Sequence, residues 1–127
     1  MSTRSQTIIN FGEKRVLTFY RHCDGYPQGH GCDLCKAVEK AGDDVIELLS
    51  LLRIYDIEIE PAMVGERGDI EFLYEVTYPD PLGYYPEGRP DVNVRITKTR
   101  SWESRIVLYD GTPKDVRMEI IMGKGAR

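Results

Sequence analysis

Residues 5–22 read Ser-Gln-Thr-Ile-Ile-Asn-Phe-Gly-Glu-Lys-Arg-Val-Leu-Thr-Phe-Tyr-Arg-His. Two runs rich in β-branched and aromatic residues, 5–11 and 15–22, flank the connection Gly12-Glu-Lys14, which has the length and the glycine of a hairpin turn. Alternate side chains of a strand point to opposite faces, and in the second run both faces carry apolar groups. We therefore predict a β-hairpin whose second strand lies inside a sheet.

Two helical patterns follow. The first is an i, i+3, i+4, i+7 stripe that predicts a helix from about Cys32, ended by Gly42. Asp43 or Asp44 can cap a second helix. The apolar residues of the two stripes are Leu34, Ala37, Val38 and Ala41, then Val45, Leu48, Leu49 and Leu52. We expect the second helix to be the most buried of the protein.

The rest of the chain predicts further strands at 69–78, 92–99 and 105–109, the first of them half-exposed because its residues alternate. Residues 79–91 contain four prolines and two glycines, which predicts a long ordered loop. Thr112-Pro113-Lys114-Asp115 resembles a capped helix start, so a short C-terminal helix should end near Gly123. The predicted class is α+β: an antiparallel or mixed sheet starting with a β-hairpin, with two central helices packed on one face.

Composition limits the classes of protein that remain. The 127 residues, 41% hydrophobic and 30% charged, predict a single α+β domain over 1–127 and exclude a disordered chain. The longest apolar run is far short of the ~20 residues of a membrane helix, and the N-terminus lacks the apolar core of a secretory signal. Three cysteines, an odd number in a chain that is not exported, favour the reducing cytoplasm.

The net charge of −4 conceals an asymmetry along the chain. Residues 1–42 sum to +2, residues 43–91 to −10 and residues 92–127 to +4. Two solvated faces of opposite sign would explain this pattern, and so would a cationic surface for an anionic ligand built from both ends of the chain. A pI near 5.2 argues against general nucleic-acid binding.

The loop from Arg21 to Gly31 is the segment most suggestive of chemistry. A glycine-rich turn from a strand into a helix exposes backbone N–H groups beside the positive end of the helix dipole, where an anion can bind. The chain lacks the spacing of a phosphate-binding P-loop or of a dinucleotide fingerprint. The alternative is a purely structural turn. The candidate ligand-binding residues of the loop are Arg21, His22, Asp24, Gly25, Tyr26, Gly29, His30 and Gly31.

Several short segments resemble a family of short proteins encoded mainly by phages, prophages and their bacterial hosts. The segments are Met1-Ser-Thr-Arg-Ser5, Tyr20-Arg21-His22, Asp24-Gly25-Tyr26-Pro27 and Gly29-His30-Gly31. The resemblance covers about the first third of the chain and implies a phage setting and a shared site to which Arg4 also contributes. It implies no reaction. Cys23 stands where similar proteins have an aromatic or small residue.

The cysteines allow a second interpretation. Cys32-Asp-Leu-Cys35 is a C-x₂-C pair, and with Cys23 and His30 it could supply the four ligands of a zinc site. Against this, structural zinc sites normally combine two such pairs. A redox role would lower the pKa of the Cys32 thiol at the helix start, but the βαβ setting of that motif is absent.

Three functions remain open. The first is a cytoplasmic binding protein that holds a phosphate- or nucleotide-like ligand at the loop. A phage would benefit from such a protein if it sequestered a host immune signal or blocked a host defence protein. The second is a metal-dependent phosphoester hydrolase using His22, Asp24 and His30. It would need a second carboxylate cluster, and the sequence does not place Glu58, Glu60 and Asp69 relative to the loop. The third is a protein-interaction module without a small ligand.

Two further features bear on partners. Tyr78, Tyr84 and Tyr85 lie on or beside the proline-rich loop, which suits an oligomer contact or a lid. Four cationic residues surround the only tryptophan, an arrangement that can grip a base and its phosphate or form a solvated face. They are Arg95, Lys98, Arg100 and Arg105 around Trp102.

Overall fold

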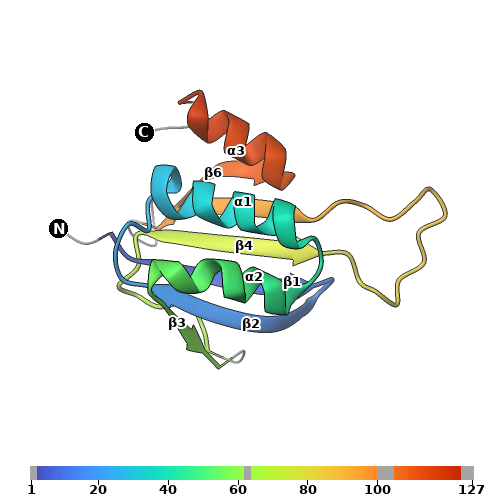
Figure 1. Ribbon diagram of the computed structural model, residues 1–127, viewed down its shortest axis with the longest axis horizontal. Helices are drawn as coiled ribbons and strands as arrows, with labels where there is room; N and C mark the ends of the chain where they lie inside the picture. The colour runs from blue at the N-terminus through green and yellow to red at the C-terminus, as the bar shows by residue number, and fades with distance from the viewer. Residues whose placement is uncertain (1–2, 62–63, 100–104, 124–127) are drawn as a thin grey trace.

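A six-stranded mixed sheet forms the body of the protein in the computed structural model, which describes residues 3–61, 64–99 and 105–123. The strand order is β3-β2-β1-β4-β5-β6 (Figure 1). β1 and β4 pair in parallel, and the other four pairings are antiparallel. The strands are β1 Ser5–Phe11, β2 Lys14–Arg21, β3 Ile57–Glu60, β4 Phe72–Tyr78, β5 Asn93–Thr99 and β6 Arg105–Gly111.

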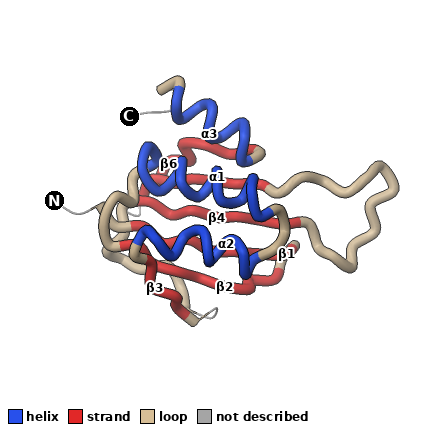
Figure 2. Tube along the Cα trace, viewed as in Figure 1, coloured by secondary structure: helices blue, strands red, loops and turns tan. Residues whose placement is uncertain are grey.

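The helices lie together on one face of this sheet, as Figure 2 shows. They are α1 Cys32–Ala41, α2 Val45–Leu52 and α3 Pro113–Ile121, with a π-type turn η1 at Pro27–Gly31 and a 3₁₀ turn η2 at Arg53–Tyr55. The α+β class, the opening hairpin, the two mid-chain helices and the C-terminal helix are confirmed. β2 has a strand on each side, as its two apolar faces predicted.

Local chemistry sets the helix ends. The Asp44 side chain accepts a hydrogen bond from the Glu47 amide at 3.1 Å, which caps α2. Thr112 accepts from the Asp115 amide at 3.2 Å, with proline at the first helical position. α1 ends at Gly42, whose φ of 61° is easy only for glycine. These three boundaries follow from the capping residues that the sequence displays.

The prediction that the second helix is the most buried is wrong. α1 buries five side chains, whereas α2 buries only Leu48 and Leu52 and leaves Ile46 79% exposed. The reason is position: α1 lies between α2 and α3, whereas α2 has a helix neighbour on one side only (Figure 1).

On the face of the sheet opposite the helices, residues 64–70 pack over part of β1, β2 and β4. A second apolar cluster forms there from Ile8, Tyr20, Ile70 and Leu73. Gln6 binds the Gly65 carbonyl at 3.1 Å, and Arg67 stacks on the Tyr20 ring. β4 alternates as predicted for 69–78. Its residues Phe72, Tyr74, Val76 and Tyr78 are buried in the main core, whereas on the opposite face Leu73 is buried and Glu75 and Thr77 are partly exposed. β3 was not predicted, because its Ile-Glu-Ile-Glu sequence is too short and too charged to stand out.

Among the helices of the described residues, none combines the length and the apolar character that crossing a membrane requires.

Candidate functional site

One end of the sheet gathers most of the predicted site residues. There the start of β1 meets the end of β2 and the start of β4, since Ser5 pairs with both Arg21 and Phe72. Phe72 in turn pairs with Lys98 near the end of β5. The glycine-rich loop 22–31 leaves β2 at this end and enters α1 through the η1 turn. The strand register thus brings segments distant in sequence beside the loop.

His30 is fully buried at the centre of this end, on the helix side of the sheet. Its Nδ1 lies 3.2 Å from Nη1 of Arg21, and its Nε2 lies 2.9 Å from Oγ1 of Thr7. A guanidinium can only donate, so Nδ1 accepts, and the ring proton of the neutral histidine is on Nε2, which donates to Thr7. The Tyr74 and His30 rings are perpendicular and pack edge to face, with their centroids 4.7 Å apart.

The surroundings of His30 keep it uncharged. Burial lowers the pKa of the ring, and the positive charge of Arg21 lowers it further, to about 3. Protonating Nδ1 would also direct a new N–H at the Arg21 donor. His30 is therefore neutral near pH 7, where it neither attracts an anion nor exchanges a proton with a substrate.

Arg21 is also committed inside the fold. It is 6% exposed, its Nη1 lies 3.2 Å from an oxygen of Asp33 in the first turn of α1, and its guanidinium lies 4.9 Å from the centroid of the Tyr55 ring. The Arg21–Asp33 ion pair links the end of β2 to the start of α1. Its Nε and the hydroxyl of Ser5 are buried without a hydrogen-bond partner in the described part of the chain.

The backbone amides that would have to bind an anion already donate hydrogen bonds to backbone carbonyls of the protein. The Gly25 amide donates to Thr3 at 2.9 Å, the Gly29 amide to Tyr26 at 3.0 Å and the His30 amide to Asp24 at 2.9 Å. The Tyr74 hydroxyl donates to the Gly25 carbonyl at 2.6 Å. These three amides serve the internal structure of the loop and form no open nest.

Two of the loop glycines are required for close packing. A Cβ on Gly25 would lie 2.8 Å from the Cβ of Ser5 and 2.8 Å from the Thr3 carbonyl. A Cβ on Gly29 would lie 2.7 Å from the Asp24 carbonyl. The glycine pattern that suggested ligand approach is thus explained by the approach of one backbone segment to another.

The remaining predicted residues do not converge. His22 is exposed, and its Nδ1 lies 3.2 Å from the Tyr20 hydroxyl, whereas Tyr20 belongs to the cluster on the helix-free face. Arg4 pairs with Asp69 at 3.4 Å, and Asp24 is exposed. Tyr26 is 39% exposed beside the loop. The set used in the hydrolase alternative is therefore divided between a buried His30 and an exposed His22.

The zinc alternative is not supported by the arrangement of the cysteines. Cys23 is exposed, Cys32 half-buried and Cys35 buried, and both ring nitrogens of His30 are engaged. Within 3–61, 64–99 and 105–123, no three His, Cys, Asp or Glu side chains are grouped so that they could hold a metal ion.

The thiol chemistry also differs from the redox interpretation. Burial raises the pKa of the Cys32 thiol, and burial with the neighbouring Cys32 raises that of Cys35 to about 12. The lowered Cys32 pKa expected of a redox C-x-x-C is therefore wrong. Both thiols are therefore protonated near neutral pH, Cys35 as a small buried side chain and Cys32 as a half-buried one.

Two of the three carboxylates named for the hydrolase are engaged by one arginine, and the third, Glu58, is exposed on β3. Arg67 binds Glu60 at 3.1 Å and Asp69 at 3.1 Å. The hydrogen bond from Arg67, more than any other interaction, lowers the pKa of Asp69. These groups hold the segment 64–69 against the sheet.

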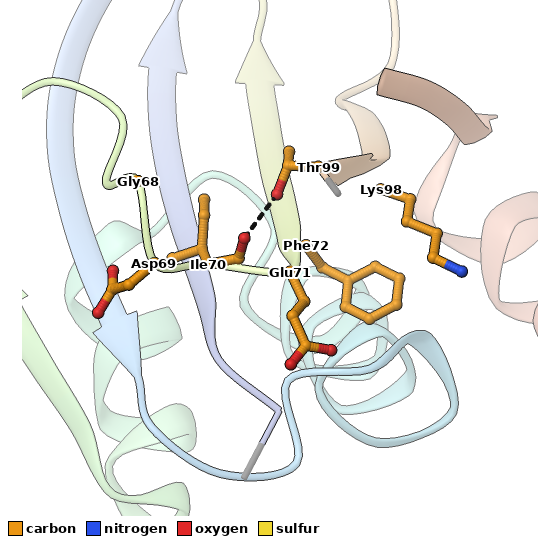
Figure 3. Close-up of a pocket in the computed structure, with 7 residues that line it drawn as sticks. All are labelled: Gly68, Asp69, Ile70, Glu71, Phe72, Lys98 and Thr99. Atoms are coloured by element: carbon orange, nitrogen blue, oxygen red, sulfur yellow. Dashed lines mark hydrogen bonds between the residues drawn. The ribbon is translucent and has the colours of Figure 1, made fainter. Parts of the chain in front are cut away.

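Two adjoining pockets lie next to the loop. We call the first, with a volume of about 320 Å³, the aromatic pocket. We call the second, with a volume of about 410 Å³, the polar pocket, and Figure 3 shows it. They share Phe72 and Lys98. The aromatic pocket is lined by Tyr26, Pro27, Gln28, Phe72, Lys98, Leu108 and Tyr109. The polar pocket is lined by Gly68, Asp69, Ile70, Glu71, Phe72, Lys98 and Thr99.

The pocket side chains combine rings, a cation and carboxylates. Figure 3 shows the Phe72 ring between the Glu71 carboxylate and Lys98, with Thr99 bonded to the Ile70 carbonyl at 2.8 Å. The Tyr109 hydroxyl is buried without a hydrogen-bond partner among the residues described. Of the predicted site residues, Tyr26 lines the aromatic pocket, and Arg4 reaches the polar pocket through Asp69.

Sequence reasoning missed most of this pocket. Phe72, Lys98 and Tyr109 lie on three strands, and only the strand register brings them together. Lys98 had been noted as part of a cationic group around Trp102, but residues 100–104 lie outside the described part of the chain. Arg95 pairs with Asp110 and Arg105 with Glu66.

The resemblance to the phage-encoded family stays a prediction. Comparisons of the chain with protein-family models, with curated proteins and with solved structures found no match.

Proposed function

We propose that this protein binds a small ligand that joins a planar ring to an anionic group, a nucleotide being the model chemistry. In this proposal the ligand occupies the aromatic and polar pockets, beside the glycine-rich loop, and not the loop amides. The observation that supports it is the junction of the two pockets, which share Phe72 and Lys98, together with the rings of Tyr26 and Tyr109 that line the aromatic pocket.

Each wall has a role in such binding. The exposed Tyr26 ring offers a stacking surface for a base, an interaction worth about 1–3 kcal/mol. The Lys98 ammonium pairs with a phosphate, and the Glu71 carboxylate accepts hydrogen bonds from sugar hydroxyls. The charge of Asp69 is offset by Arg67 and Arg4, which limits its repulsion of an anion.

Binding without turnover is the better fit. His30, the buried histidine, is neutral and bonded at both nitrogens, so it does not act as an acid or base near pH 7. His22 contacts Tyr20 of the cluster on the helix-free face, away from the loop interior. Sequestration of a nucleotide signal in a phage setting is the biological form of this proposal.

The test is a ¹H–¹⁵N NMR titration with AMP, GMP, CMP and UMP, each to about 5 mM, which detects millimolar Kd values. At least one nucleotide should shift the amides of residues 26–28, 72, 98 and 108–109. Tyr26→Ala and Lys98→Ala should weaken that binding at least tenfold, by about 1.4 kcal/mol. The matched control, Tyr84→Ala, changes an exposed tyrosine outside both pockets and should bind like the wild type.

Three outcomes would overturn the proposal. They are no shift with any of the four nucleotides, shifts confined to another surface, or shifts that both pocket variants leave unchanged.

A further inference from the structure

The loop between β4 and β5 stands away from the body of the protein (Figures 1 and 2). It spans 79–92 and carries two large apolar side chains almost wholly in solvent: Leu82 is 94% exposed and Tyr84 is 88% exposed. Exposed apolar side chains are common singly, but two on one projecting segment are typical of a contact surface.

Internal hydrogen bonds give this loop a defined shape. Asp80 organises it, because its side chain accepts from the Leu82 amide at 2.9 Å, while its carbonyl accepts from the Gly83 amide and the Tyr85 hydroxyl, both at 3.0 Å. Arg89 pairs with Asp43 at 3.5 Å near the base of the loop. A loop ordered before binding loses less conformational entropy in a complex.

A groove of about 770 Å³ lies where the loop leaves the body. The β1–β2 turn forms one side of it, held to the end of β4 by the Gly12 amide, which donates to the Tyr78 carbonyl at 2.8 Å, and by Phe11 stacked on Tyr78 at 4.9 Å. Its lining is mainly apolar surface, with charged groups of both signs. The lining residues are Phe11, Glu13, Lys14, Arg15, Val16, Asp80, Pro81 and Leu82.

We propose that two copies of this chain associate about a two-fold axis, with Tyr84 of each copy seated in the groove of the other. The groove lies at the base of the loop, whereas Tyr84 lies near the middle of the loop. When two loops pack antiparallel, the Tyr84 side chain of each copy therefore enters the groove of the other. This is the self-complementarity that a two-fold interface requires. The contact also covers Leu82 on the groove wall.

Charge favours the same occupant. Beyond Tyr84 the loop contributes the exposed Glu87, while its one cation, Arg89, is paired with Asp43 near the base of the loop. The groove presents Lys14 and Arg15 on the β1–β2 turn, although Glu13 and Asp80 also line it. With Tyr84 in the groove of the other copy, Glu87 lies toward the cationic β1–β2 turn of that copy, which favours encounter in this orientation.

Sedimentation velocity over about 5–500 µM, a range that brackets micromolar Kd values, tests the association. The wild type should sediment as a reversible dimer. Tyr84→Ser and Leu82→Ser should each weaken the dimer at least about tenfold, as expected for central aromatic and apolar contacts. The control is Ile46→Ser on α2, which removes a comparably exposed apolar side chain and should leave the dimer unchanged.

A photo-crosslink tests the arrangement. Benzoylphenylalanine at position 84, in a mixture of ¹⁴N and ¹⁵N chains, should give hybrid peptides that join position 84 to residues 11–16 of the other copy. A monomer at every concentration, a dimer insensitive to both loop variants, or crosslinks only to other regions would overturn the proposal. Because the groove is remote from the aromatic pocket, failure of this dimer leaves the nucleotide titration untouched.

Discussion

Lowering the pH from 7 to 5 should weaken the folded state through His30. The folded-state pKa of this ring is about 3, lowered first by burial and then by the charge of Arg21, whereas an unfolded histidine titrates near 6.5. Below pH 6.5 the unfolded chain therefore binds a proton that the folded chain does not. Stability falls as the pH drops from 6.5 toward 3 and is insensitive to this group above 6.5.

The size of the effect follows from the difference in pKa. Each unit corresponds to 1.36 kcal/mol, so the whole window is worth about 5 kcal/mol and the step from pH 7 to pH 5 about 2 kcal/mol. That step is a large part of the ~5–15 kcal/mol that stabilises a typical domain.

Urea unfolding followed by circular dichroism at pH 7, 6 and 5 measures the effect. The informative variant is His30→Gln, whose amide can still donate to Thr7 but does not titrate. Between pH 7 and pH 5 the wild type should lose about 2 kcal/mol more stability than this variant does. His22→Gln is the matched control, because the other histidine of the chain is exposed, and it should keep the wild-type slope.

Equal slopes for the wild type and His30→Gln would refute the reasoning. If His30→Gln does not fold, the ring signals of the wild type decide instead by NMR. The His30 signal should show no titration between pH 7 and pH 5, and a midpoint near 6 would contradict the assigned environment.

Three further predictions concern the same end of the sheet. Gly25→Ala should lower stability by about 1–3 kcal/mol in thermal unfolding, because the new Cβ meets Ser5 and Thr3, whereas Gly65→Ala, with open space at its Cβ, should change little. Arg21→Met should lower the free energy of unfolding by about 3–5 kcal/mol, because Asp33 loses its buried partner. It should also raise the pKa of His30 measured by NMR, and an unchanged His30 titration would contradict the assigned Arg21 contact. Iodoacetamide at pH 7.5, read by peptide mass spectrometry, should leave Cys35 unmodified in the native protein and modify it in urea, because this thiol is buried with a pKa of about 12; rapid native labelling of Cys35 would exclude that burial.

The glycine-rich loop beside the candidate site could be singled out from the sequence, but its structural role could not. The segment 21–31 is the tight junction between β2 and α1, as its glycines and position predicted. Which groups remain available depends on partners far away: Thr3 takes the Gly25 amide, Thr7 the His30 ring and Tyr74 the Gly25 carbonyl. No local pattern shows that these donors and acceptors are already used, so a structural junction and an anion site look alike in the sequence.

Local rules were sufficient for the elements themselves. Hydrophobic periodicity, the glycine of the 12–14 turn, Asp44 and the Thr112-Pro113 pair specify the hairpin and helices, because each rule acts within a few residues. The tertiary structure alone decided the rest. It buries α1 more than α2, brings the short strand β3 to the sheet edge, and assembles the aromatic and polar pockets from four separate segments. These outcomes depend on strand order and register, which arise from contacts between distant parts of the chain and leave no periodic trace in the sequence.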